Sequence, residues 1–160
     1  MLSKLLKKHE SVIPIKIFLS LSWMLLILVF SINSNFKGLI KQGDLAFSFT
    51  SNPDFSNLFV FYQFNSSLII VQKAGHFLAF VLLTIFLIFC FSSLHKVFFI
   101  GLAYGLATEM IQPFFHRDGR ILDVIINWSG VFLCVFVFVC IRQSVAIVES
   151  LKIPKHSEKV

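Results

Sequence analysis

Charged residues are scarce in this sequence. Asp, Glu, Lys and Arg make up only 14% of the 160 residues, hydrophobic residues make up 57%, and the mean hydropathy is +0.86. Soluble domains average about 25% charged residues, so a water-soluble globule is excluded. The chain also has only seven glycines and four prolines, which excludes a collagen-like repeat, and its low polarity excludes a disordered chain.

Cysteine and the common catalytic motifs are also rare or missing. Cys90, Cys134 and Cys140 lie inside apolar runs without a CxxC pair, so neither a disulfide framework nor a zinc site is indicated. No GxSxG motif supplies a nucleophile, and no pair of ligands has the spacing of HExxH. Paired repeats are missing as well, which disfavours a secondary transporter. We therefore predict no metal and no cofactor.

The chain does contain four apolar runs long enough to cross a bilayer. Pro14 stands at the start of the first run, where its fixed φ suits a first helical turn, and Pro113 stops the third. We predict an all-α membrane protein, a four-transmembrane-helix bundle. The predicted spans are approximately Ile15–Ile32, Leu68–Phe91, Val97–Gln112 and Asp123–Ile141.

The start of the chain also fits a signal peptide, because basic residues precede the first apolar run. The segment after Phe30 reads SINSN and offers no clean A-x-A cleavage site, so we expect the run to be kept as an anchor.

The distribution of basic residues predicts the orientation of the bundle. With the N-terminus inside, nine of the 14 Lys and Arg residues lie on the inner side. They are Lys4, Lys7, Lys8, Lys16, Lys96, Arg142, Lys152, Lys155 and Lys159. The outer five are Lys37, Lys41, Lys73, Arg117 and Arg120. Both termini are therefore predicted to be cytoplasmic, and the net charge of +6 requires no nucleic-acid partner.

These spans divide the chain into three parts. We predict a cytoplasmic N-terminus over residues 1–13, a membrane domain over 14–142 and a cytoplasmic tail over 143–160. Residues 33–67 form an external loop that is rich in phenylalanine. The loop either lies in the membrane interface, with its rings at headgroup depth, or covers a site as a lid.

Polar residues at membrane depth are costly and need partners, so their positions are informative. In this sequence they fall on shared helix faces at the outer ends of three spans. Lys73 and His76 share a face, as do Glu109 and Gln112, while Asp123, Asn127 and Gly130 follow at i, i+4 and i+7. The loop before the fourth span adds His116, Arg117, Asp118 and Arg120.

These groups are predicted to meet, because the second and fourth spans begin on the outer side and the third ends there. Three interpretations stay open: a polar network that only clamps the helices, a binding site for an anionic headgroup, and a catalytic site. The candidate ligand-binding residues are Lys73, His76, Glu109, Gln112, Arg117, Arg120, Asp123 and Asn127. The candidate catalytic residues are His76, Glu109 and Asp123.

Small residues in the third and fourth spans favour close helix packing. Gly101 and Gly105 form a GxxxG pattern, which either packs within the bundle or makes contact with a second subunit. Gly130 has the same packing role in the fourth span.

The pattern Lys73-x-x-His76, Glu109-x-x-Gln112, Arg117 and Asp123-x-x-x-Asn127-x-x-Gly130 resembles the VanZ-like family of small bacterial membrane proteins. The resemblance covers residues 73–130. The sequence departs from the family at His116, where a small residue often precedes the arginine, and at Cys134, where a second glycine often follows.

The resemblance implies a multi-pass protein of the bacterial cytoplasmic membrane with a link to the cell envelope, and it raises a connection with resistance to the lipoglycopeptide teicoplanin. We expect a protein that binds membrane lipids, or an anionic or lipid-linked envelope precursor, at the outer leaflet. The alternatives are an enzyme acting on lipid-linked phosphates and an assembly partner of another membrane protein.

Overall fold

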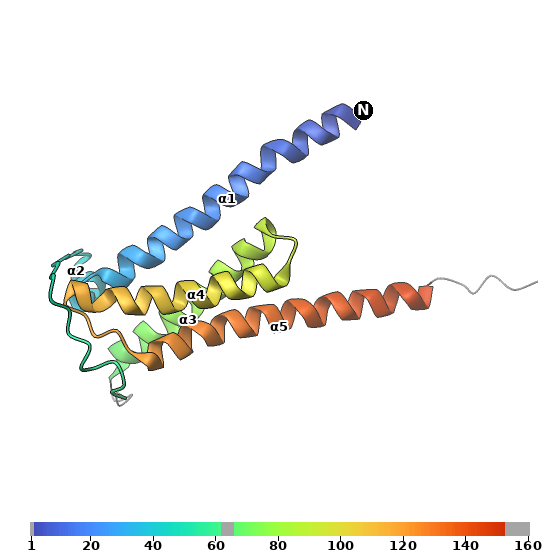
Figure 1. Ribbon diagram of the computed structural model, residues 1–160. Coiled ribbons are helices and arrows are strands. Elements are labelled where there is room, and N and C mark those ends of the chain that lie inside the picture. Colours follow the sequence, from blue (N-terminus) through green and yellow to red (C-terminus); the bar gives the residue numbers. More distant parts are fainter. Residues whose placement is uncertain (1, 62–65, 153–160) are drawn as a thin grey trace, which may run out of the picture.

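A computed structural model describes residues 2–61 and 66–152, with side chains described over 14–61 and 66–151. These residues form helices and irregular segments, without a strand among them. The elements are α1 (Leu2–Ile32), α2 (Phe36–Gln42), α3 (Ser67–Cys90), α4 (Leu94–Ile111), the 3₁₀-helix η1 (Gln112–Phe115) and α5 (Ile121–Lys152) (Figure 1).

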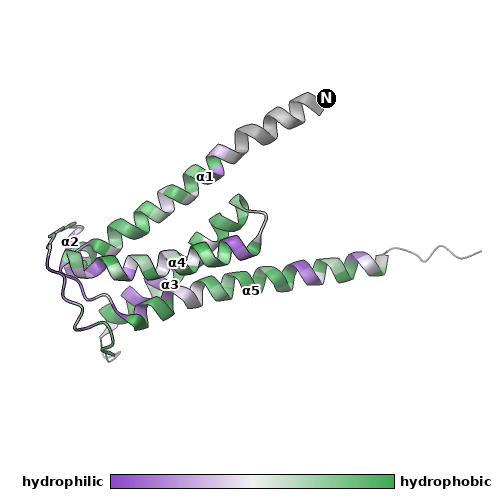
Figure 2. Ribbon diagram, viewed as in Figure 1, coloured by the Kyte–Doolittle hydropathy of each residue, from purple (hydrophilic) through white to green (hydrophobic). Residues whose placement is uncertain are grey.

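Four helices are long and apolar enough to span a membrane, which confirms the predicted fold class. The spans are Pro14–Ile32, Ser67–Cys90, Leu94–Phe115 and Ile121–Leu151. Figure 2 shows hydrophobic residues along their middle parts and hydrophilic residues gathered toward the ends. The helices therefore bury little of their apolar surface inside the chain and present much of it outward, as a bilayer requires.

The prediction that Pro14 opens the first helix was wrong. Helix α1 begins at Leu2 and runs through Pro14 without ending. Proline removes one main-chain hydrogen bond from a helix, but membrane helices tolerate it because non-helical backbone would leave more polar groups unsatisfied in lipid.

Helices α1 and α5 continue beyond the domain boundaries predicted from the sequence. The boundary at 13/14 falls inside α1, and the boundary at 142/143 falls inside α5. The side chains of residues 2–13, including the basic ones, and the last part of the predicted tail, residues 153–160, lie outside the described residues.

Helix α3 lies at the centre of the bundle and packs against α1, α4 and α5. Residues 91–93 join α3 to α4 at one end, whereas α2, η1 and the start of α5 gather at the other, called here the loop end (Figure 1). Toward its N-terminus, α1 leans away from the remaining helices (Figure 1).

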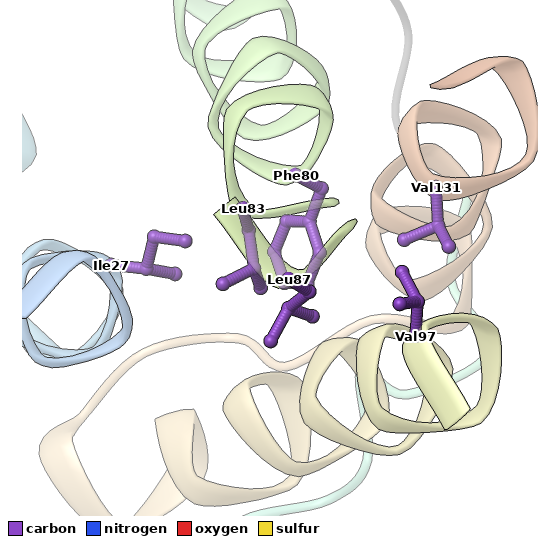
Figure 3. Close-up of a cluster of buried hydrophobic side chains, with 6 residues drawn as sticks. All are labelled: Ile27, Phe80, Leu83, Leu87, Val97 and Val131. Atoms are coloured by element: carbon purple, nitrogen blue, oxygen red, sulfur yellow. The ribbon is translucent and has the colours of Figure 1, made fainter. Parts of the chain in front are cut away.

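A small apolar core joins all four spans. Figure 3 shows its six side chains, Ile27 from α1, Phe80, Leu83 and Leu87 from α3, Val97 from α4 and Val131 from α5. Beside this core, the Tyr104 hydroxyl donates to the main-chain carbonyl of Met24 and so ties α4 to α1. The core therefore holds the four spans together at one level along their axes.

Glycines allow the closest helix contacts. A Cβ atom on Gly130 would lie 2.5 Å from the carbonyl oxygen of Phe77, so the backbones of α5 and α3 are in contact at this point. Gly101 and Gly105 face α5, where a Cβ would lie 3.0 Å from Val131 and 3.2 Å from Trp128. The GxxxG pattern thus packs within the chain, and contact with a second subunit through it stays a prediction.

The aromatic loop contains α2 and is tied to the loop end by main-chain hydrogen bonds. Thr50 N–H donates to the Phe114 carbonyl at 2.8 Å, and Ile121 N–H donates to the Leu58 carbonyl at 2.9 Å. Phe59 remains 76% exposed. An anchored loop with outward rings fits an interfacial segment, in which aromatic side chains sit at headgroup depth.

Candidate functional site

A buried ion pair joins α3 to the first turn of α5 at the loop end. Lys73 Nζ lies 2.7 Å from Asp123 Oδ1 and donates to Asp123 Oδ2 at 2.8 Å. Asp123 is 3% exposed, and its place in the first turn of α5 lets the helix dipole favour its negative charge. Both charges are thus matched where lipid would otherwise make them costly.

A second polar layer lies one helical turn deeper. His76 Nδ1 is 3.2 Å from Asn127 Oδ1, and Asn127 Nδ2 donates to Glu109 Oε1 at 3.2 Å. His76 Nδ1 also lies 3.7 Å from Glu109 Oε1. An amide oxygen only accepts, so the bond to Asn127 requires a proton on His76 Nδ1. In the neutral ring, Nε2 is then an acceptor.

Three buried polar atoms have no hydrogen-bond partner among residues 14–61 and 66–151. They are Asn33 Nδ2, Glu109 Oε2 and Gln112 Nε2. Glu109 is 0% exposed and Gln112 is 2% exposed, and both lie at the loop end, where α4 passes into η1. Buried polar atoms of this kind usually bond to water or to a ligand, so the interior beneath the loop end is a polar one.

Arg117 ties the α4–α5 connection to the end of α1. Its Nη1 donates to the Phe30 carbonyl at 3.2 Å and to the Asn33 carbonyl at 3.1 Å. Carbonyls at a helix C-terminus lack partners within the helix and carry a partial negative charge, so a guanidinium suits this position. Burial lowers the pKa of Arg117, while Glu109 and Asp123 raise it. The group remains a cation.

The remaining charged residues of this connection lie nearer to the surface. Arg120 Nη2 donates to Asp118 Oδ2 at 2.8 Å, and Asn57 Nδ2 donates to Asp118 Oδ1 at 3.0 Å. The hydrogen bond from Arg120 lowers the pKa of Asp118. His116, which directly precedes Arg117, has a φ of 53°. This is the left-handed backbone conformation, which is unfavourable for most residues other than glycine.

The polar pocket at the loop end has a volume of about 330 Å³. It is lined by Ser34, Ile69, Gln72, Lys73, His116, Arg117, Asp118, Arg120 and Asp123. Three cations and two carboxylates therefore face the same space.

The apolar groove adjoins this pocket and has a volume of about 340 Å³. It runs between α1, α2 and α3, and is lined by Trp23, Leu26, Ile27, Phe30, Ser31, Phe36, Leu39, Ile40, Val71, Gln72, Gly75, His76, Ala79, Phe80 and Arg117. Gln72 and Arg117 line both spaces. The polar pocket and the apolar groove thus meet at two shared residues.

The structure brings the eight predicted site residues to one end of the bundle, but at different depths. Lys73, Arg117, Arg120 and Asp123 line the polar pocket, and His76 lines the apolar groove. Glu109, Gln112 and Asn127 are buried and line neither space. Whether any of the eight contacts a ligand stays a prediction.

Sequence reasoning missed Gln72 and the whole apolar groove. A glutamine inside an apolar run, next to Lys73, was the available signal for the first. The sequence held no signal for the second, because only the structure shows that Gly75 lacks a packing partner. Within the described residues, no group of three His, Cys, Asp or Glu is placed to hold a metal ion.

Comparison with known proteins shows similarity over most of the chain. The family described as VanZ/LLP1 matches residues 16–142. An uncharacterized membrane protein of Bacillus subtilis (strain 168), YwnJ, is 30% identical over 123 residues, which cover 76% of this chain and 88% of the relative. No solved structure matches the chain significantly.

Proposed function

The chain belongs to the VanZ/LLP1 family, and on this premise we propose that its polar pocket binds the anionic headgroup of a membrane lipid. The lining of the pocket carries the proposal. Lys73, Arg117 and Arg120 face Asp118 and Asp123, which leaves one positive charge in excess when His116 is counted as neutral. A single negative charge, such as that of a phosphodiester, would balance the pocket.

The binding energy would come from charge-assisted hydrogen bonds in a partly desolvated space. Arginine and lysine side chains supply donors suited to phosphate oxygens. Asp118 and Asp123 would hold Arg120 and Lys73 in place, because each carboxylate already accepts a hydrogen bond from one of these cations. The pocket is thus organised before a ligand arrives.

The proposal places the pocket at the outer leaflet of a bacterial cytoplasmic membrane. An even number of spans puts both ends of the described chain on the same side, and the excess of basic residues predicts that side to be cytoplasmic. The loop end then faces outward. A lipid of the outer leaflet, or a lipid-linked envelope precursor, would reach the pocket from that side.

One observation favours a second candidate, an enzyme acting on lipid-linked phosphates. His76, Asn127 and Glu109 form a continuous hydrogen-bonded chain, which would orient the imidazole so that His76 Nε2 could accept a proton from a substrate. Turnover of a lipid-linked phosphate that is lost in both His76→Gln and Glu109→Gln, while binding persists, would select the enzyme. Binding without turnover in the wild-type protein would select the binding protein.

The envelope role has a cellular counterpart. If the bound lipid is an envelope precursor, deleting the protein should change the sensitivity of the cell to teicoplanin, and Arg120→Gln should reproduce the deletion. An unchanged sensitivity would separate lipid binding from resistance.

A titration with a phosphodiester lipid tests the proposal directly. Arg120→Gln removes a cation from the pocket, whereas Arg142→Gln removes an exposed cation from the far part of α5. We expect Arg120→Gln to weaken binding about tenfold, as for the loss of one charge-assisted hydrogen bond, and Arg142→Gln to leave it unchanged. Equal affinity in all three proteins would contradict the proposal.

A further inference from the structure

The apolar groove is lined by side chains from three helices. Trp23 and Phe30 from α1, Leu39 from α2, and Val71 and Ala79 from α3 line it. Away from the polar pocket, the Trp23 indole N–H donates to the Ala79 carbonyl at 3.0 Å and so joins the α1 and α3 walls of the groove. Its outer end reaches Arg117 and the polar pocket.

We propose that this groove takes one hydrocarbon chain of the anionic lipid, which enters sideways from the bilayer while the headgroup occupies the polar pocket. This inference rests on the proposed function and deepens it, since it makes the ligand an intact lipid rather than a soluble anion. The two adjoining spaces identify the ligand as an anionic lipid. The apolar groove matches its hydrocarbon chain, and the cationic polar pocket matches its headgroup.

The length of the groove fits one chain in one leaflet. On α3 the lining runs from Val71 to Phe80, nine residues apart, which spans about 14 Å along a helix. Half of a hydrocarbon core of about 30 Å is nearly the same distance. A chain lying along α3 would therefore begin at headgroup level and end near the middle of the bilayer.

Gly75 keeps the groove open. A Cβ atom built on this residue meets nothing within 4 Å, unlike one on Gly130, which would meet the backbone of α3. Gly75 therefore serves no helix packing among the described residues. Any larger side chain at position 75 would project into the space that the hydrocarbon chain needs.

Gly75→Leu provides the first test, with Ala74→Leu as its matched control. Ala74 is the exposed neighbour on the same helix and does not line the groove. Because leucine fills the groove, we expect Gly75→Leu to weaken binding of a phosphodiester lipid at least tenfold. Binding of the same phosphodiester headgroup without its acyl chains should stay unchanged. Ala74→Leu should bind both ligands as the wild-type protein does.

The outcomes separate this inference from the proposed function. If Gly75→Leu binds the lipid as tightly as Ala74→Leu does, the groove does not hold the chain, although the polar pocket still binds the headgroup. If the wild-type protein binds neither the lipid nor the chain-free headgroup, both proposals are wrong.

Photo-crosslinking provides a second test that does not depend on the stability of a variant. A diazirine analogue of leucine is placed either at Leu26, which lines the groove, or at its neighbour Leu25, which is 61% exposed and does not line it. In a mixed anionic and zwitterionic bilayer, we expect the crosslinks at position 26 to be enriched several-fold in the anionic lipid. Crosslinks at position 25 should follow the bulk composition. Identical lipid profiles at the two positions would overturn the inference.

Discussion

Lys73 and Asp123 form a buried ion pair in which Nζ lies within 2.8 Å of both carboxylate oxygens. The pair joins α3 to the first turn of α5 at the loop end, and both residues line the polar pocket. It therefore has two separable roles, one in holding the helices together and one in setting the charge of the pocket.

Asp123→Asn should destabilise the fold by about 3 kcal/mol, because Lys73 would lose its carboxylate while remaining buried. The double variant Lys73→Met, Asp123→Leu should recover most of that stability but bind no anionic lipid. Thermal unfolding in detergent, followed by a lipid titration, measures both effects. A melting temperature of Asp123→Asn equal to that of the wild-type protein would contradict the structural role.

Two glycine-to-alanine changes should differ in their effect on stability. Gly130→Ala places a methyl group 2.5 Å from the Phe77 carbonyl oxygen, so α5 must move away from α3 at a cost of about 2 kcal/mol. Gly75→Ala meets nothing within 4 Å and should be neutral or slightly stabilising. Circular dichroism melting curves of the two variants provide the comparison. Similar melting temperatures would show that the contact at Gly130 is not tight.

Asp118 should give a small acid dependence to stability. The hydrogen bond from Arg120 holds the pKa of Asp118 below its ordinary value of 3.8, so the contribution is present at neutral pH and is lost as the pH falls through the folded pKa. The carboxylate is half exposed, and we expect about 0.5 kcal/mol or less. The melting temperatures of wild type and Asp118→Asn should differ slightly at pH 6, and the difference should shrink as the pH falls below 3.8. A difference that grows as the pH falls would contradict this sign.

Single cysteines test the orientation of the bundle. Ser56 lies in the aromatic loop between α2 and α3, and Ser150 lies in the last turn of α5. Both residues are exposed. With the three native cysteines replaced, Ser56→Cys should react with an impermeant thiol reagent in intact cells, whereas Ser150→Cys should react only after the membrane is opened. The reverse pattern would place the polar pocket on the cytoplasmic side.

The sequence was sufficient to predict the four spans and the gathering of polar residues at one end of the bundle. Helix α4 ends just before Pro113, but the third span continues through this proline as the 3₁₀-helix η1. The spans follow from local hydropathy, and the gathering follows from the order of the spans along the chain. The partners within the polar cluster were not predictable. Pairing of Lys73 with Asp123, rather than with Glu109, depends on the rotation of α3 against α5, which the contact at Gly130 sets.

The helix α2, the 3₁₀-helix η1 and the apolar groove were also beyond sequence reasoning. Helix α2 has only seven residues and is held by its caps, since Asn35 Oδ1 accepts from the Gly38 N–H and Gly43 adopts a left-handed conformation. The groove lies between the C-terminal part of α1, the short helix α2 and helix α3. Such spaces follow from the packing of separate segments, and no pattern within one segment records them.

Native mass spectrometry of the protein extracted gently from its own membrane provides the decisive test of anionic lipid binding. We expect one anionic lipid to be retained per chain, lost in Arg120→Gln and kept in Arg142→Gln. Retention of zwitterionic and anionic lipids in their bulk proportions, with no difference between these two variants, would contradict the proposal.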